Sequence, residues 1–278
     1  MIMDDKFKFS VLMTVWGGER PAYLDKAIDS VIRQTVCPNE LVIVEDGELT
    51  WDLTGILEMW QTKEKDIVRR VKTGSRVGLA KALNIGLQNC TCDWVARMDS
   101  DDISVSNRFE KQREYLINNP GVSVLGGFIE EYNENMEIAF GVRRVPVTQD
   151  GIVKYSKWRS PMNHVSVIYK RSDVLSVGGY SNDMVKLQDY NLWAKMMRGG
   201  YLFENISEIL VYVRTGESFL DRRGGLAYFK YEYSNLMFLY KIGHIGFYQF
   251  VFGVMGRFVI RMVPGSIRRM AYQCLRKT

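Results

Sequence analysis

The sequence predicts an α/β fold in which helices flank a mostly parallel central sheet. Short apolar runs of strand type alternate with stretches whose apolar residues recur at helical spacing, which is typical of a parallel sheet. Several of the apolar runs end on carboxylates, and ligands of open sheets bind at the carboxyl ends of strands. With 278 residues, 46% of them hydrophobic and 25% charged, the chain can bury a sizeable core.

The first half of the chain alternates strands and helices regularly. We expect strands at 9–15, 40–46, 66–71 and 93–98, and helices that begin at Pro21 and span about 78–88. Proline is favoured in the first turn of a helix. Leu79, Leu83 and Leu87 share one face of the second helix.

The second half is less regular. We expect strands at 122–127, 164–169 and 209–213, a helix near 107–118, and a helix at 189–198 that ends at Gly199 and Gly200. The order of these strands in the sheet cannot be read from the pattern.

Three carboxylates directly follow the predicted strand at 93–98. Asp99, Asp101 and Asp102 repel one another unless a cation is present. An Asp-x-Asp pair on such a turn can hold Mg²⁺ or Mn²⁺ and leave positions open for phosphate oxygens. The alternative is a solvated acidic turn, or Asp99 as the cap of the following helix. An EF-hand is excluded because its glycine and its twelfth-position glutamate are missing.

Five segments in this order resemble family 2 glycosyltransferases of the GT-A fold, particularly bacterial enzymes of O-antigen, capsule and exopolysaccharide assembly. They are SVLMTV (10–15), ELVIVEDG (40–47), GLAKALNIG (78–86), ARMDSDDI (96–103) with Arg108 and Gln112, and GGY (178–180) followed by QDYNLW (188–193). The resemblance implies a Rossmann-like GT-A domain at 1–218, with a nucleotide-binding half at about 8–104 and an acceptor half at about 105–218.

The resemblance also implies a nucleotide pocket formed by Thr14, Val15, Asp46, Gly78, Lys81 and Asp99. Asp46 would accept a hydrogen bond from uracil, or else only cap the end of its strand. Asp99 and Asp101 would hold the Mn²⁺ or Mg²⁺ that bridges the diphosphate. Lys81 would meet a phosphate, or else is a solvated helix lysine.

Asp189 matches the general base that takes the proton of the acceptor hydroxyl. A carboxylate can do this at neutral pH because the hydroxyl becomes acidic as the new bond forms. The Glu-Asp pair of the family reads Gln188-Asp189 here, and Asp189 as a mere N-cap is the alternative. The implied mechanism is a single in-line displacement that inverts the anomeric configuration and releases UDP.

Four residues have more open roles. His164 and Arg214 would contact the acceptor or a phosphate, and Trp193 and Tyr190 would form a floor for the acceptor sugar. Three of them have a structural alternative: a hydrogen-bonded imidazole for His164, and core packing for the two aromatic rings. Gln188 is also expected on the acceptor side.

The C-terminal tail at 219–278 is basic. Residues 233–278 hold seven Lys and Arg and no Asp or Glu, so the remaining chain, with 30 basic and 32 acidic residues, has a net charge of −2. Arg257, Arg261 and Arg268 recur on one side of a helix that Pro264 and Gly265 kink or split. We expect amphipathic helices on an anionic bilayer. A spanning helix and a subdomain packed on the core are the alternatives.

These features predict an inverting, metal-dependent enzyme that moves a hexose from a UDP-sugar to a sugar on undecaprenyl diphosphate. By similarity the hexose is galactose, with glucose and N-acetylhexosamine as alternatives. The scattered cysteines and the acidic N-terminus, which lacks an apolar signal, predict a peripheral protein at the cytoplasmic face of the bacterial inner membrane. No nucleic-acid motif is present.

Two other functions remain open. A sugar nucleotidyltransferase would need a glycine-rich basic loop after the first strand, where residues 16–20 offer only one basic side chain. An inactive carbohydrate-binding or scaffold relative would tolerate the loss of Asp101 or Asp189, and both are present.

Overall fold

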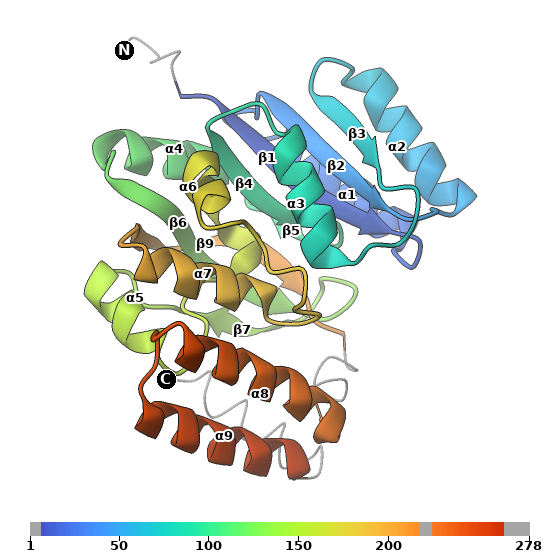
Figure 1. The fold of residues 1–278 in the computed structure, drawn as a ribbon. Coiled ribbons are helices and arrows are strands. Elements are labelled where there is room, and N and C mark those ends of the chain that lie inside the picture. Colours follow the sequence, from blue (N-terminus) through green and yellow to red (C-terminus); the bar gives the residue numbers. More distant parts are fainter. Residues whose placement is uncertain (1–6, 217–223, 264–278) are drawn as a thin grey trace.

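The computed structural model describes residues 7–216 and 224–263 (Figure 1). The strands are β1 (Phe9–Trp16), β2 (Glu40–Asp46), β3 (Val68–Lys72), β4 (Trp94–Asp99), β5 (Ile103–Ser104), β6 (Val122–Tyr132), β7 (Ala139–Arg143), β8 (Ile168–Lys170) and β9 (Leu202–Arg214). The helices are α1 (Pro21–Ile32), α2 (Trp51–Lys63), α3 (Leu79–Asn89), α4 (Arg108–Asn118), α5 (Gln149–Tyr155), α6 (Arg171–Ser176), α7 (Gln188–Arg198), α8 (Gly225–Lys241) and α9 (Phe247–Met262), with a 3₁₀ turn at His164–Ser166.

A single mixed sheet connects the two halves of the chain. Its strand order is β3-β2-β1-β4-β8-β6-β9-β5, with β7 paired to β6. The first four strands are parallel, whereas β8 runs antiparallel to both β4 and β6. The register sets Thr14 opposite Asp99 and Trp16 opposite Asp46, so the carboxyl ends of β1, β2 and β4 meet at one edge.

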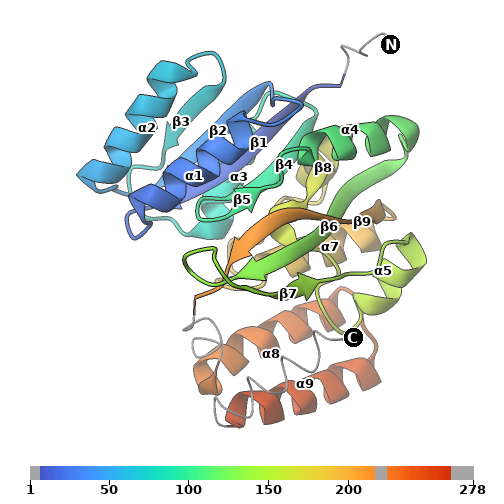
Figure 2. The same cartoon turned by 180° about the vertical axis from the view of Figure 1, so that it is seen from behind.

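Helices cover both faces of the sheet (Figures 1 and 2). Alternate strand residues such as Val11 and Met13 pack with α1, α2 and α4, while Leu12 and Val44 pack with α3 in a second cluster that includes α7. This alternation follows from the two-residue period of a strand. Helix α3 lies close to the sheet because Gly86 has no side chain: a Cβ there would lie 2.2 Å from Leu12 Cδ1.

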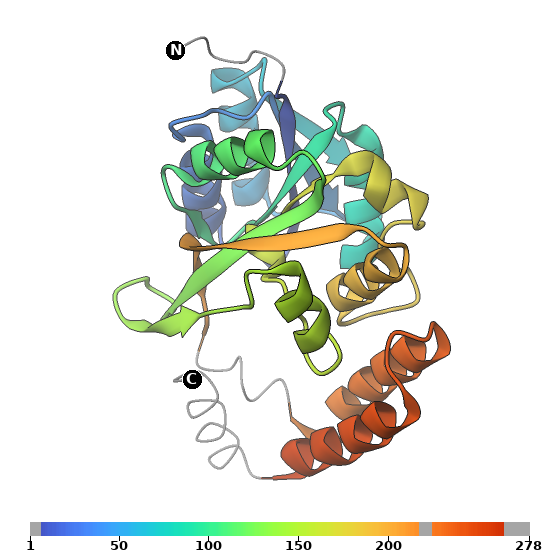
Figure 3. The same cartoon turned by 90° about the vertical axis from the view of Figure 1, so that its left-hand side faces the viewer.

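Helices α8 and α9 form a hairpin that packs against α7, at the end of the molecule farthest from β3 and α2 (Figures 1 and 3). The contact is a small apolar cluster of Tyr190, Ala194, Leu236, Leu239 and Ile245. The tail helices are therefore packed on the core, as the third alternative for this segment expected.

Most predicted elements occur within two residues of their expected positions. The segment at 164–166 is a 3₁₀ turn rather than part of a strand, and β9 covers 202–214 rather than 209–213. Helices α2, α5 and α6 and strands β5 and β7 were not predicted. Helix α2 buries only three residues, Leu53, Leu57 and Trp60, so its apolar residues give a weak helical pattern.

Candidate active site

A large cleft of about 1320 Å³ opens at the edge of the sheet where the strands end. Its walls come from the loop before α3, the turn after β4, strands β6 and β7, the segment 157–165, the start of α7, and the hairpin of α8 and α9. Sites for one small ligand usually measure about 300–1,000 Å³. The cleft is therefore large enough for two substrates together.

Asp46 anchors the loop at one end of the cleft. Its Oδ1 accepts hydrogen bonds from the backbone N–H of Val77 at 2.6 Å and of Gly78 at 3.2 Å. Gly47 has a φ of +86°, and a Cβ there would lie 2.9 Å from the nitrogen of Arg76. The Arg76 guanidinium lies 4.2 Å from the centre of the Trp16 ring. Asp46 thus holds the loop in place, and a carboxylate has further lone pairs for a ligand.

The residues predicted for the nucleotide pocket divide into two groups. Gly78, Lys81 and Asp99 line the cleft, and Lys81 is exposed in the first turn of α3. Thr14 lies opposite Asp99, while the Val15 side chain packs in the core at 1% exposure. Val15 therefore offers a ligand only its backbone.

The acidic turn after β4 is partly neutralised by arginine. The Asp99 carboxylate forms an ion pair with the buried Arg97 guanidinium. Burial, followed by the charges of Asp99 and Glu19, raises the pKa of Asp101 to about 7. Burial and the neighbouring aspartates also raise the pKa of Asp102 well above its ordinary value. The turn retains more negative charge than its protein neighbours balance.

Arg214 at the end of β9 anchors this turn. Its backbone N–H donates to Asp102 Oδ1 at 2.8 Å, and its Nε donates to the Asp101 carbonyl at 2.5 Å. Its guanidinium lies 4.1 Å from the centre of the Tyr23 ring. Arg214 is buried, so in this structure it positions the turn rather than contacting a phosphate in the cleft.

The turn fits a divalent cation as a partial ligand set. Among the described residues no group of three or more His, Cys, Asp or Glu is arranged to hold a metal ion. Asp99 and Asp102 line the cleft, whereas Asp101 is not among the lining residues. Mg²⁺ is commonly bound by one or two carboxylates together with substrate phosphates. A bound cation would relieve the repulsion between these carboxylates, which contributes to their raised pKa values.

Asp189 lies in the cleft at the second position of α7 and is half-buried. The N-cap of the helix is Leu187, whose backbone is left-handed with φ 63° and ψ 23°. The alternative that Asp189 only caps the helix is therefore wrong. Gln188, at the first position, also lines the cleft.

His164 lines the cleft as a neutral imidazole. Burial, followed by the charge of Arg97, lowers its pKa well below the ordinary value. Its Nε2 lies 2.9 Å from the Tyr180 hydroxyl. This contact is close to the structural alternative, in which the imidazole of His164 is hydrogen-bonded. Its partner is the side chain of Tyr180, whereas the backbone was expected.

The two predicted acceptor aromatics belong to the core. Trp193 has no exposed surface, and its ring packs against His164, Tyr169 and Phe203. The expectation that Trp193 forms a floor for a sugar is therefore wrong. Tyr190 is buried except at the cleft, and its hydroxyl donates to the Ser156 carbonyl at 2.5 Å.

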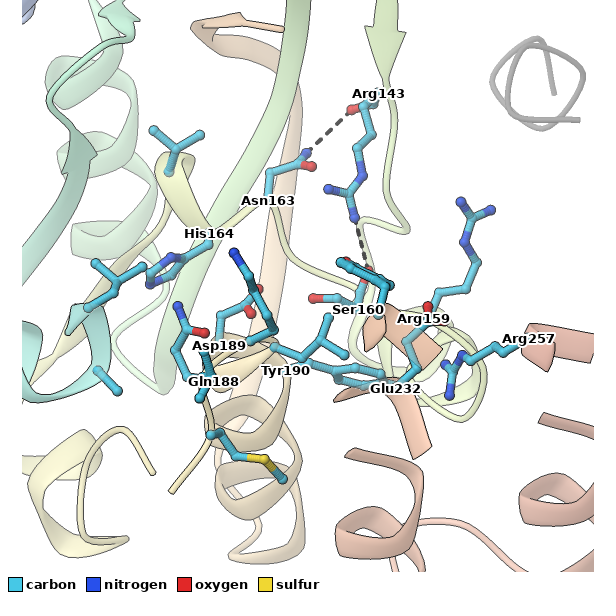
Figure 4. Close-up of a pocket in the computed structure, with 18 of the residues that line it drawn as sticks. Arg143, Arg159, Ser160, Asn163, His164, Gln188, Asp189, Tyr190, Glu232 and Arg257 are labelled. Atoms are coloured by element: carbon cyan, nitrogen blue, oxygen red, sulfur yellow. Dashed lines mark hydrogen bonds between the residues drawn. The ribbon is translucent and has the colours of Figure 1, made fainter. Parts of the chain in front are cut away.

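Several cleft residues have no signal in the sequence pattern. Figure 4 shows Arg159 and Arg257 beyond Tyr190 as seen from His164, and Arg143 beyond Asn163. Arg144 lines the same cleft. The pair Arg143-Arg144 is visible in the sequence, but no spacing connects it to Arg159 or Arg257.

The helical tail differs from the expected arrangement. Arg261 is 7% exposed and donates to both carboxylate oxygens of Glu232, each at 2.7 Å. Arg257 and Arg261 share one side of α9, as their spacing predicted, but that side lines the cleft and does not face outward. Arg268, Pro264 and Gly265 lie outside the described residues. The exposed stripe of α9 is apolar and comprises Tyr248, Phe252, Met255, Val259 and Met262. In the described ranges, no helix has the length and apolar content needed to cross a membrane.

Comparisons with known proteins agree with one another. Residues 10–174 match the model of "Glycosyl transferase family 2". The chain is 34% identical to an Escherichia coli protein named UDP-Gal:alpha-D-GlcNAc-diphosphoundecaprenol beta-1,3-galactosyltransferase, over 97% of both chains. It is 31% identical to the amylovoran biosynthesis glycosyltransferase AmsE of Erwinia amylovora, over 97% of this chain and 99% of that one.

A solved structure shows the same fold. It is the mannosyltransferase PcManGT of Pyrobaculum calidifontis, in complex with GDP-Man and Mn²⁺, with a TM-score of 0.63 and 16% identity. The match covers 87% of this chain and 66% of that one. At this identity the likeness concerns the fold alone.

Proposed function

The chain belongs to glycosyl transferase family 2, and from this membership we propose that it transfers galactose from UDP-galactose to a sugar on a lipid diphosphate. It is an enzyme with the GT-A fold, as the sequence resemblance implied, and family membership disfavours a sugar nucleotidyltransferase. The observation that carries the proposal is the cleft. The loop at 76–81, the acidic turn and the carboxylate of Asp189 line the same space, which is large enough for two substrates.

The proposed donor is bound at the end formed by residues 76–81 and the acidic turn. Asp46 fixes the loop, and the exposed ammonium of Lys81 is available for a phosphate. Asp99 and Asp101 would hold Mn²⁺ or Mg²⁺, with Asp102 close by on the cleft wall. When bound, the cation would offset negative charge on the departing diphosphate.

The proposed reaction is one displacement with inversion. Asp189 accepts the proton of the acceptor hydroxyl while that oxygen bonds to the anomeric carbon and the bond to UDP breaks. Arg97, paired with Asp99, adds a fixed positive charge behind the turn. The hairpin and the segment 157–165 form another wall of the cleft.

The proposed setting is the cytoplasmic face of the bacterial inner membrane, in the assembly of a surface polysaccharide. The similar galactosyltransferase of Escherichia coli has a diphosphoundecaprenol acceptor in its name, and such a lipid resides in a bilayer. The apolar stripe of α9 supports peripheral contact with that surface, because exposed apolar side chains at helical spacing insert at lipid interfaces.

The decisive experiment incubates the purified chain with a panel of UDP-sugars, Mn²⁺ and synthetic GlcNAc-diphosphate-lipid. We expect product with UDP-galactose, loss of product on chelation of the metal, and a β-linkage by NMR. Absence of product from every UDP-sugar and diphosphate-linked acceptor tested would contradict the proposed function. An α-linkage would contradict inversion alone.

A further inference from the structure

The cleft has a second charged region besides the acidic turn. Basic side chains in this region are Arg143, Arg144, Lys157, Arg159 and Arg257, and the acidic side chains that line it are Glu131, Asp189 and Glu232. Glu232 is already paired by Arg261, and Lys157 donates to the His244 carbonyl. We use the name arginine cluster for Arg143, Arg159 and Arg257.

The arginine cluster has donors that the described part of the chain leaves available. Arg159 is exposed, and its recorded neighbour is the Tyr155 ring at 5.9 Å. Arg257 donates one Nη to the Trp158 carbonyl at 3.0 Å, while its other Nη is buried with no hydrogen-bond partner among the described residues. Arg143 donates to the Ser160 carbonyl at 3.4 Å, and the nearby charges of Glu131 and Asp189 partly offset the lowering of its pKa by burial. Guanidinium groups with spare donors suit the oxygens of phosphate.

The position of the cluster follows the chemistry of a sugar linked through its anomeric carbon. Asp189 must face the accepting hydroxyl, which lies on the side of the sugar nearest the donor. The anomeric substituent of the same sugar then lies one ring farther from the donor. Figure 4 shows Arg159 and Arg257 on the other side of Tyr190 from His164 and Asp189, which matches that direction, and Arg143 between Asn163 and Ser160.

Arg257 also connects this region to the hairpin. It is carried by α9, and its charge partly offsets the rise that burial causes in the pKa of Tyr190. Arg257 lies on the side of α9 that lines the cleft, about half a helical turn around from the exposed stripe.

We propose that Arg143, Arg159 and Arg257 bind the diphosphate of a lipid-linked acceptor, at a subsite separate from the one for the donor diphosphate. This inference deepens the proposed function and rests on it. It assigns the hairpin a direct part in substrate binding through Arg257, in addition to any contact with the bilayer.

The test measures binding by calorimetry with Mn²⁺ and saturating UDP, so that the donor subsite is occupied. The probes are farnesyl diphosphate, farnesyl monophosphate and farnesol, which carry the same chain and no sugar. We expect the diphosphate to bind about tenfold more tightly than the monophosphate, because a charged hydrogen bond contributes about 1.5 kcal/mol or more. R159Q and R257Q should each remove most of this preference without changing the affinity for UDP.

Lys154→Gln is the matched control, because Lys154 is an exposed cation of α5 that does not line the cleft. R159Q alters an exposed side chain, so loss of folding is not expected. Equal affinity for the three probes, or an unchanged preference in both arginine variants, would overturn the subsite while leaving donor binding intact. Failure of the wild-type chain to bind UDP would instead overturn the proposed function.

Discussion

At the scale of single residues, the backbone of Leu187 places the carboxylate of Asp189. A left-handed conformation at a residue other than glycine costs about 1–2 kcal/mol, and Leu187 adopts it directly before α7 begins. Strained backbone of this kind tends to persist at functional sites, where the surrounding structure holds it. The strained backbone of Leu187 therefore supports a functional role for the first turn of α7, which carries Asp189.

Asp189→Asn should reduce transfer about 10³-fold, because an amide cannot accept the proton of the acceptor hydroxyl. Binding of UDP should remain within about twofold of the wild type, since the side chain lies away from the donor end. Both quantities can be measured on the same preparation by product formation and calorimetry. Asp183→Asn, which alters an exposed acid of the preceding loop outside the cleft lining, is the control. Wild-type turnover by the Asp189 variant would disprove the assignment of the base.

His244 predicts a stability that depends on pH. Burial, followed by the charge of Lys157, lowers its pKa to about 4, and its Nε2 lies 2.9 Å from the Ser156 hydroxyl. The folded state prefers the neutral imidazole, so this contribution is complete above the unfolded pKa of about 6.5 and is lost as the pH falls toward 4. At pH 5 the loss is about 2 kcal/mol.

The measurement compares unfolding of the wild type and His244→Gln at pH 7.5 and pH 5. The glutamine keeps a hydrogen-bonding group but does not titrate, so the variant should lose less stability on acidification. Comparing the two proteins removes the opposing contribution of Asp101 and Asp102, whose raised pKa values favour the folded state at low pH. Identical pH dependence in both proteins would refute the role of His244.

Site residues were predictable where they form part of an ordered set of motifs. Asp99 and Asp189 were reached in this way, and both line the cleft. Trp193 was misassigned because an aromatic ring at helical spacing gives the same pattern in a core as in a sugar site. The arginine cluster was missed because its members come from β7, the segment after α5, and α9, and only the fold brings them together.

At the scale of elements, the hairpin depends on one buried ion pair. Glu232→Gln would leave the Arg261 charge buried with an incomplete partner, and we expect a loss of about 3 kcal/mol in the free energy of unfolding. Replacing both residues by methionine should recover most of it, because the pair also carries a desolvation cost. Denaturant unfolding checks both values.

The control for this pair is Asp29→Asn, which breaks the exposed pair of Asp29 and Arg33 within α1. Its effect should stay within about 0.5 kcal/mol, as is usual for surface pairs one helical turn apart. Comparable losses at the two sites would show that burial does not strengthen the pair of Glu232 and Arg261.

The elements themselves were largely predictable, and their exceptions have local causes. Strands β1, β2 and β4 are rich in apolar residues on both faces because both faces are covered. Strand β9 is longer than its apolar run, since residues 202–206 also pair with β6 although they include Glu204 and Asn205. A pairing partner distant in sequence extended this strand beyond its own pattern.

At the scale of the whole molecule, the outward stripe of α9 predicts binding to membranes. Residues 248, 252, 255, 259 and 262 follow helical spacing, and each side chain is at least 41% exposed. Replacing Met255 and Val259 by glutamine should lower binding to vesicles of phosphatidylethanolamine and phosphatidylglycerol about tenfold, because apolar area at the interface is lost. Sedimentation of the vesicles measures this.

Trp51→Gln is the control, since Trp51 is 90% exposed on α2 at the opposite end of the molecule. Its removal should leave vesicle binding unchanged. Full binding by the α9 variant would show that the stripe does not make the membrane contact.

The arrangement of the whole could not be read from the sequence. The basic count of residues 233–278 pointed to arginines on the outer surface, but Glu232 lies one residue before that range and draws Arg261 inward. Likewise, the strand order places β8 between β4 and β6, which joins the two halves of the chain. Both features depend on contacts between distant segments, which periodicity does not encode.

The outward stripe of α9 also bears on how the protein must be handled. Within residues 7–216 and 224–263, nothing covers the apolar side chains that α9 turns outward. We expect such faces to associate in plain buffer, so a mild detergent should accompany the protein from lysis to assay.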